Sequence, residues 1–136
     1  MAEIPKMYKI YLLVVAIICF MYAILNIALT EIYIASLGPY FYYNPWGDRL
    51  TGFTLLCFGI FNVLAVMRPE WDKIKRYLEF GLLWMAFGLI QGVFQFADVN
   101  ITSYPGVLMN TIVAYTFMAV FFALGLLLYL QERKKS

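Results

Sequence analysis

The sequence predicts an all-α fold, an integral membrane bundle of four transmembrane helices with both ends of the chain in the cytoplasm. Composition is the first reason: of 136 residues, 64% are hydrophobic and 13% are charged, whereas a soluble domain averages about 45–50% apolar and about 25% charged. The second reason is the presence of four apolar stretches near the length of about 20 residues that a membrane-spanning helix needs. The third is the distribution of the basic residues, almost all of which fall on one side of those stretches.

The four predicted spans cover residues 10–29, 50–67, 77–97 and 107–130 of a single membrane domain, residues 1–136. None contains lysine, arginine or proline, so no predicted span carries a buried cation or a proline kink. The spans are apolar on all sides and do not alternate with a period of two, which argues against a β-barrel. A cleaved signal peptide is the alternative for residues 10–29, but its apolar run exceeds the usual length of about 7–15 residues.

The basic residues predict the orientation of these spans. They lie before the first span, between the second and third, and after the fourth: Lys6, Lys9, Arg68, Lys73, Lys75, Arg76, Arg133, Lys134 and Lys135. Only Arg49 lies on the other side. Because basic flanks remain in the cytoplasm, we expect both ends of the chain to be inside, and the cell membrane to be the location.

The outer link between the first two spans, residues 30–49, is long and aromatic. It contains Tyr33, Tyr40, Phe41, Tyr42, Tyr43 and Trp46, and amphipathic aromatic residues gather where membrane meets water. We therefore expect residues 38–47 to lie along the outer surface as an irregular or interfacial segment that forms an anchoring belt, with a lid or docking surface as the alternative. Trp71 is expected to anchor the inner side in the same way.

The residue types that carry most membrane chemistry are missing. The chain has no histidine, the usual ligand of membrane haems and of zinc, copper and iron. Its two cysteines form no CxxC pair, and no GxSxG, HExxH or phosphate-binding-loop pattern is present. The sequence therefore predicts a protein that is not an enzyme and has no catalytic residue, metal or cofactor, with a lipid or quinone ligand left open. A net charge of +2 without a basic stripe also argues against nucleic acid as a partner.

No carboxylate lies in the middle of a predicted span, which argues against a small proton-coupled exporter. Glu79 is close to the start of the third span, four residues after Lys75. A carboxylate in the first turn of a helix is stabilised by the helix dipole, and a lysine four residues away adds an ion pair. We therefore expect Glu79 to support its helix rather than to take part in chemistry.

Small residues on the spans predict how the helices pack. Lipid provides no hydrophobic force between helices, so they associate through close backbone contact and hydrogen bonds. The residues expected to permit such contact are Gly52, Gly59, Gly88, Gly92, Ala119 and Ala123. The pairs 88 and 92, and 119 and 123, have the four-residue spacing that favours helix association.

Polar residues of the spans gather at one depth. With both ends of the chain inside, these residues lie in the outer half of the membrane or just above it: Asn26, Thr30, Glu31, Asp48, Arg49, Gln91, Gln95, Asp98, Asn110 and Thr111. Polar side chains in lipid often serve only to hold helices together, and this is the plainer explanation. The alternative hypothesis is a polar vestibule that opens outward and binds a ligand under the aromatic link.

Residues 48–98 resemble the small four-helix membrane families related to DoxX and BphX. The similarity lies in the Gly-rich run GFTLLCFG from Gly52 to Gly59, the short charged link RPE that begins at Arg68, and a Gly-containing third span that ends in Asp98. Members of such families sometimes occur beside quinone-linked or aromatic-degrading enzymes. The resemblance implies an accessory role near a redox complex, and it carries no catalytic residue over to this chain.

These features favour a structural function. We expect a non-catalytic accessory subunit of a larger membrane complex or a small homo-oligomer, because the chain is short, lacks catalytic motifs and is apolar on nearly every helix face. Its partners are then membrane lipid and other membrane subunits or further copies of itself. The alternative is a binder or carrier of a small hydrophobic or amphipathic molecule, a lipid or a quinone, in the vestibule. A third hypothesis is a membrane enzyme built on Asp98, Glu31 or Arg49.

Overall fold

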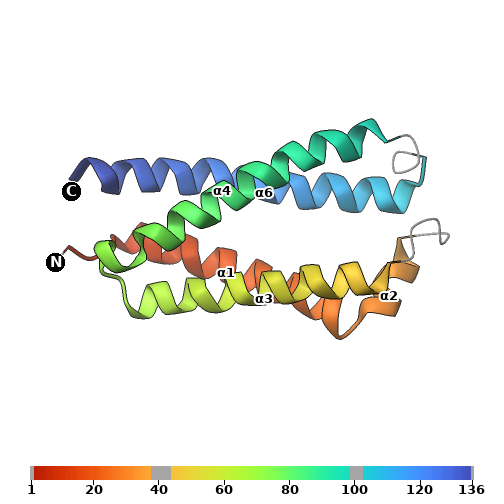
Figure 1. Cartoon of the computed structure of the whole chain (residues 1–136), viewed down its shortest axis with the longest axis horizontal. Coiled ribbons are helices and arrows are strands. Elements are labelled where there is room, and N and C mark those ends of the chain that lie inside the picture. Colours follow the sequence, from red (N-terminus) through yellow and green to blue (C-terminus); the bar gives the residue numbers. More distant parts are fainter. Residues whose placement is uncertain (1, 38–43, 99–102, 136) are drawn as a thin grey trace.

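The computed structural model describes residues 2–37, 44–98 and 103–135, and these residues are helical almost throughout (Figure 1). The five described helices are α1 (Lys6–Ile27), α2 (Thr30–Ser36), α3 (Pro45–Met67), α4 (Trp71–Ala97) and α6 (Pro105–Lys135). Within the described ranges, extended structure is limited to an isolated bridge between Glu3 and Glu70. The all-α prediction is therefore confirmed, and every helix except α2 is long and apolar enough to cross a membrane.

The outer link differs from the prediction because helix occupies both of its ends. α1 stops at Ile27, and the hydroxyl of Thr30 donates to the backbone oxygens of Asn26 (2.6 Å) and Ile27 (3.0 Å). These bonds use carbonyl groups that a helix end leaves without partners, and the separate helix α2 begins at Thr30. At the other end of the link, the Asn44 side chain accepts from the Gly47 N–H (3.0 Å) and Pro45 occupies the first turn of α3, which is a favourable helix start.

Residues 45–47 are the first residues of α3, so of the two forms expected for the segment 38–47, irregular or interfacial, the irregular form is wrong for these three residues. Trp46 is on this helix and is 75% exposed. The expected belt residues Tyr40, Phe41, Tyr42 and Tyr43 lie outside the described residues. Hydropathy alone marks the apolar part of a helix and not its polar first turn, which is why the sequence placed this boundary too late.

The same effect makes α4 and α6 longer than the predicted spans. α4 begins at Trp71 rather than near residue 77, and Lys75 forms an ion pair with Asp72 (3.1 Å) in its first turns. α6 continues past residue 130 to Lys135, where basic residues complement the negative end of the helix dipole. Charged residues can thus continue a helix beyond the apolar segment.

Two antiparallel pairs organise the long helices, α1 with α3 and α4 with α6 (Figure 1). Glycines mark the contact between α1 and α3: a Cβ added to Gly52 would lie 2.6 Å from Cγ1 of Ile27, and one added to Gly59 would lie 2.6 Å from Cε1 of Phe20. Both distances are far below van der Waals contact, so these two helices approach as closely as they do only because glycine has no side chain.

Glycines also line the contact between α4 and α6. A Cβ on Gly88 would lie 2.6 Å from Sδ of Met118, and one on Gly92 would lie 2.7 Å from a ring carbon of Tyr115. Ala119 and Ala123 instead lie on an exposed face of α6, so their spacing serves no close contact between the described helices. The four glycines therefore pack within pairs, and the two alanines do not.

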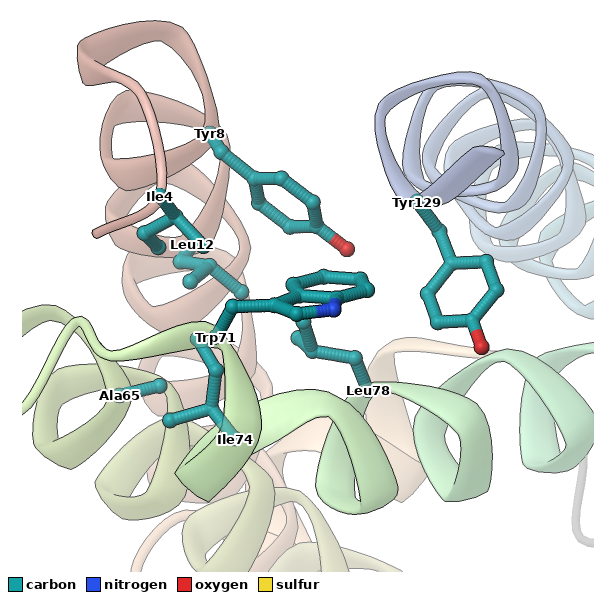
Figure 2. Close-up of a cluster of buried hydrophobic side chains, with 8 residues drawn as sticks. All are labelled: Ile4, Tyr8, Leu12, Ala65, Trp71, Ile74, Leu78 and Tyr129. Atoms are coloured by element: carbon teal, nitrogen blue, oxygen red, sulfur yellow. The ribbon is translucent and has the colours of Figure 1, made fainter. Parts of the chain in front are cut away.

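A cluster of buried side chains closes the end of the bundle where both ends of the chain lie (Figures 1 and 2). This terminal cluster consists of Ile4, Tyr8, Leu12, Ala65, Trp71, Ile74, Leu78 and Tyr129. The N-terminal segment joins it to the link before α4, since the Ile4 N–H donates to the Pro69 carbonyl (2.8 Å) and the Trp71 N–H donates to the Ala2 carbonyl (3.1 Å). The cluster thus draws on both helix pairs.

Two residues near this end take roles that differ from those expected. Trp71 is 5% exposed, with its ring centre 5.4 Å from that of Tyr129, so it packs inside the bundle rather than along a membrane surface (Figure 2). Glu79 is not in the first turn of a helix, because α4 begins eight residues earlier. Its carboxylate instead accepts a hydrogen bond from the Tyr129 hydroxyl, so the dipole explanation for Glu79 is wrong.

Candidate functional site

A cavity of about 380 Å³ lies between the two helix pairs and is lined by all five described helices. Backbone contacts are dense within each pair and sparse between the pairs, which leaves this space unfilled. Its volume falls in the range of about 300–1,000 Å³ that is typical of small-molecule sites. Aromatic side chains form much of the wall: Tyr8, Tyr11, Tyr22, Tyr33, Phe58, Tyr77, Trp84, Tyr115, Phe117 and Phe121.

The cavity is elongated along the bundle. On α1 its wall extends from Tyr8, a member of the terminal cluster, to Asn26 in the last turn of the helix. These residues are 18 positions apart, which corresponds to about 27 Å of α-helix. The cavity therefore runs along most of the length of α1, with the terminal cluster closing one end.

Three tyrosines connect the two pairs across this space. Tyr11 of α1 donates to the Phe121 carbonyl of α6 (2.7 Å), and Tyr77 of α4 donates to Oδ1 of Asn62 on α3 (2.6 Å). At the other end, Tyr33 of α2 donates to Oδ1 of Asn110 on α6 (2.6 Å). These hydroxyls are satisfied within the protein, so the middle of the cavity offers an apolar surface to whatever enters it.

Five of the predicted vestibule residues line the cavity: Asn26, Asp48, Gln95, Asn110 and Thr111. Asn26 donates from its side-chain nitrogen to the Tyr22 carbonyl (2.8 Å), and the Thr111 hydroxyl donates to the Val107 carbonyl (2.8 Å). These residues come from four different helices and meet at the end opposite the terminal cluster.

The other five predicted vestibule residues do not line the cavity. Thr30 is buried against the end of α1, Gln91 and Asp98 are exposed, and Glu31 faces Arg49 with 4.0 Å between Oε1 and Nη2. Arg49 also lies over the Trp46 ring, 5.3 Å from its centre. Gln95 lines the cavity and Gln91 is exposed, so the rotation of α4 about its axis turns Gln91 away from the site.

Charge in the cavity is confined to one side chain. Asp48 is the only Asp, Glu, Lys or Arg among the described residues of the wall. It is half-buried in the first turn of α3, and within the described ranges its carboxylate takes part in no ion pair.

The pKa of the Tyr33 phenol is shifted upward at this end of the cavity. Burial is the largest cause of the rise, and the nearby Tyr22 and Asp48 add to it, whereas the hydrogen bond to Asn110 lowers the pKa.

The bridging tyrosines are the residues that sequence reasoning missed. Tyr11 and Tyr77 each lie in an apolar stretch, where a phenol needs a hydrogen-bond partner, and this requirement is the signal that could have found them. No group of three or more His, Cys, Asp or Glu residues suited to a metal ion occurs in the described part of the chain.

Comparisons of the chain with models of protein families, with curated proteins and with solved structures found no match.

Proposed function

We propose that this chain is a multi-pass protein of the cell membrane, with four spans and both ends in the cytoplasm. Four helices have the required length and hydropathy, and only 6% of the most apolar window of α4 is buried within the chain. Large apolar side chains such as Phe87, Val93 and Phe94 are more than 60% exposed, which suits lipid better than water. Except for Arg49, the basic residues belong to segments that lie at the same end of the bundle as the two chain ends (Figure 1), and this supports a cytoplasmic position for that end.

A topology reporter tests this orientation. A reporter that is active only in the cytoplasm is expected to be active when fused after residue 135 and inactive when inserted beside Asn44, in the link opposite the chain ends. The physical reason is that basic flanks resist translocation across the membrane. Activity at the Asn44 position and none at the C-terminal position would overturn the proposed orientation.

Within the membrane, we propose that the protein is a non-catalytic binder of a small apolar or amphipathic molecule of the lipid or quinone type. The observation that carries this proposal is the cavity of about 380 Å³ between the helix pairs. A void of this size leaves its lining side chains without contacts and weakens the bundle. An occupant that restores those contacts binds without needing any specific hydrogen bond.

Filling the cavity tests the proposal. Gly81 lies on the wall, and the nearest atom to an added Cβ is Cε1 of Phe58 at 3.9 Å, so a side chain there enters open space. Gly81→Leu is expected to abolish binding while the fold is kept, and the matched variant Gly81→Ala is expected to retain binding. The measurement is native mass spectrometry of protein extracted in mild detergent from its own membrane. A wild-type protein that carries no bound small molecule would overturn the proposal.

Ala119 and Ala123 support a second candidate function, a subunit of a larger membrane complex or a homo-oligomer. Their four-residue spacing permits close helix contact, yet both lie exposed on α6, where a helix from another chain can pack. The resemblance to DoxX-like and BphX-like families agrees with an accessory role. The same mass spectra test this candidate: larger partners or a second copy support it, and Ala119→Trp is then expected to weaken the assembly.

A further inference from the structure

The charge distribution around the cavity narrows the class of ligand, an inference that rests on the proposed function. Asp48 supplies the one formal charge on the described wall, at the end of the cavity opposite the terminal cluster. Beyond it, the wall consists mainly of aromatic and aliphatic side chains and continues along about 27 Å of α1. A charged end and a long apolar body are the two parts of an amphipathic chain.

Within the described residues, no basic side chain forms an ion pair with Asp48. It lies in the first turn of α3, where the free backbone N–H groups of a helix start favour a carboxylate. The adjacent Arg49 does not neutralise it, because the Arg49 side chain contacts Glu31 and the Trp46 ring instead and is not part of the wall. When it is ionised, the Asp48 carboxylate therefore confers a negative potential on this end of the cavity.

Aromatic rings surround the same end. Tyr22, Tyr33 and Tyr115 line the cavity beside Asn26 and Asn110, and Tyr33 is held in place by its hydrogen bond to Asn110. The faces of such rings attract organic cations, and ammonium groups carrying methyl substituents are bound in this way. An anionic head group would meet repulsion from Asp48, and a neutral one would leave the carboxylate without a partner.

We propose that the cavity binds a single-chain amphipath with a cationic, ammonium-type head group, whose head lies at Asp48 and whose tail runs toward the terminal cluster. Asp48 is the counter-ion and determines the preference for positive charge. The aromatic wall binds the tail and contributes affinity without regard to the charge of the head group.

Two probes of almost equal shape separate these contributions. Dodecyltrimethylammonium is a cation, and dodecyldimethylamine oxide has an oxygen in place of one methyl group and no net charge at neutral to basic pH. Binding of each is measured by equilibrium dialysis against the full chain in lipid nanodiscs, with empty nanodiscs of the same lipid as the background. The wild-type protein is expected to prefer the ammonium by about tenfold, the size of effect that one partly screened ion pair gives.

The variant Asp48→Asn is expected to lose that preference and to keep its affinity for the amine oxide. Asp72→Asn is the control, because it removes the same charge from the opposite end of the bundle, where Asp72 pairs with Lys75. The proposal of a cationic ligand would be overturned if Asp48→Asn kept the preference for the ammonium probe, or if Asp72→Asn lost that preference to the same extent. If both probes bind equally and Gly81→Leu removes both, the cavity function stands and the charge inference fails. If neither probe binds to the wild-type protein, the ligand class proposed here is wrong, and the mass spectra decide the cavity function separately.

Discussion

Replacing Trp71 with alanine is expected to lower the free energy of unfolding by about 3–5 kcal/mol, the usual cost of emptying a buried aromatic site. Trp71 is 5% exposed and lies in the middle of the terminal cluster, against Tyr129 of α6 and beside residues of α1 (Figure 2). Loss of the ring removes contacts between the two helix pairs at the end where they meet. The change is measured by thermal or denaturant unfolding in a mild detergent.

Trp46 provides the matched control for this variant. Trp46 is 75% exposed near the start of α3, so Trp46→Ala removes an equal volume without opening a cavity. We expect a change within about 0.5 kcal/mol, as for most surface substitutions. Similar losses for Trp46→Ala and Trp71→Ala would contradict the assignment of Trp71 to the interior.

Gly52→Leu is expected to destabilise the protein by about 3 kcal/mol, at the upper end of the range for overpacked sites. A Cβ at this position would lie 2.6 Å from Cγ1 of Ile27, 2.9 Å from Cβ of Asn26 and 3.3 Å from a backbone carbon of Asn26. A backbone atom cannot turn aside as a side chain can, so α1 and α3 must separate. The measurement is unfolding in detergent, as for Trp71.

Gly81→Leu makes the same chemical change where there is room for it. An added Cβ there meets only Phe58, at 3.9 Å, so the folded protein is expected to keep its stability while losing its ligand. The two glycine variants thus distinguish a loss of stability caused by helix packing from a loss of ligand binding. Equal destabilisation by both would show that the space beside Gly81 is not available to a side chain.

The sequence predicted the four long apolar helices well because hydropathy is a property of each segment by itself. It failed at the ends of the helices, where local polar groups determine at which residue a helix begins or stops. The Asn44 side chain and Pro45 do so at the start of α3, and the Thr30 hydroxyl does so at the end of α1. α2 was missed because a helix of seven residues between two spans leaves no periodic signal. Trp71 was misplaced because an aromatic residue near a membrane boundary can pack either inward or outward, and composition does not decide between them.

The candidate site was predictable only in part. Asn26, Asp48 and Asn110 were placed at a common depth from the helix order alone, and they do line one cavity. The sequence did not reveal the cavity itself, since it arises from how far apart the two pairs lie. The direction in which Gln91 and Glu31 point depends on the rotation of each helix about its axis, and a polar stripe leaves that rotation open.

The pairing of successive long helices gives the molecule an order of assembly during synthesis. α1 and α3 can pair before the second half of the chain has been made, and α4 and α6 then pair in the same way. The bonds that join the halves connect distant residues: Tyr11 to Phe121 and Tyr33 to Asn110. Contacts between residues so far apart along the chain form late, so we expect the cavity to form at the last step, when two finished hairpins meet.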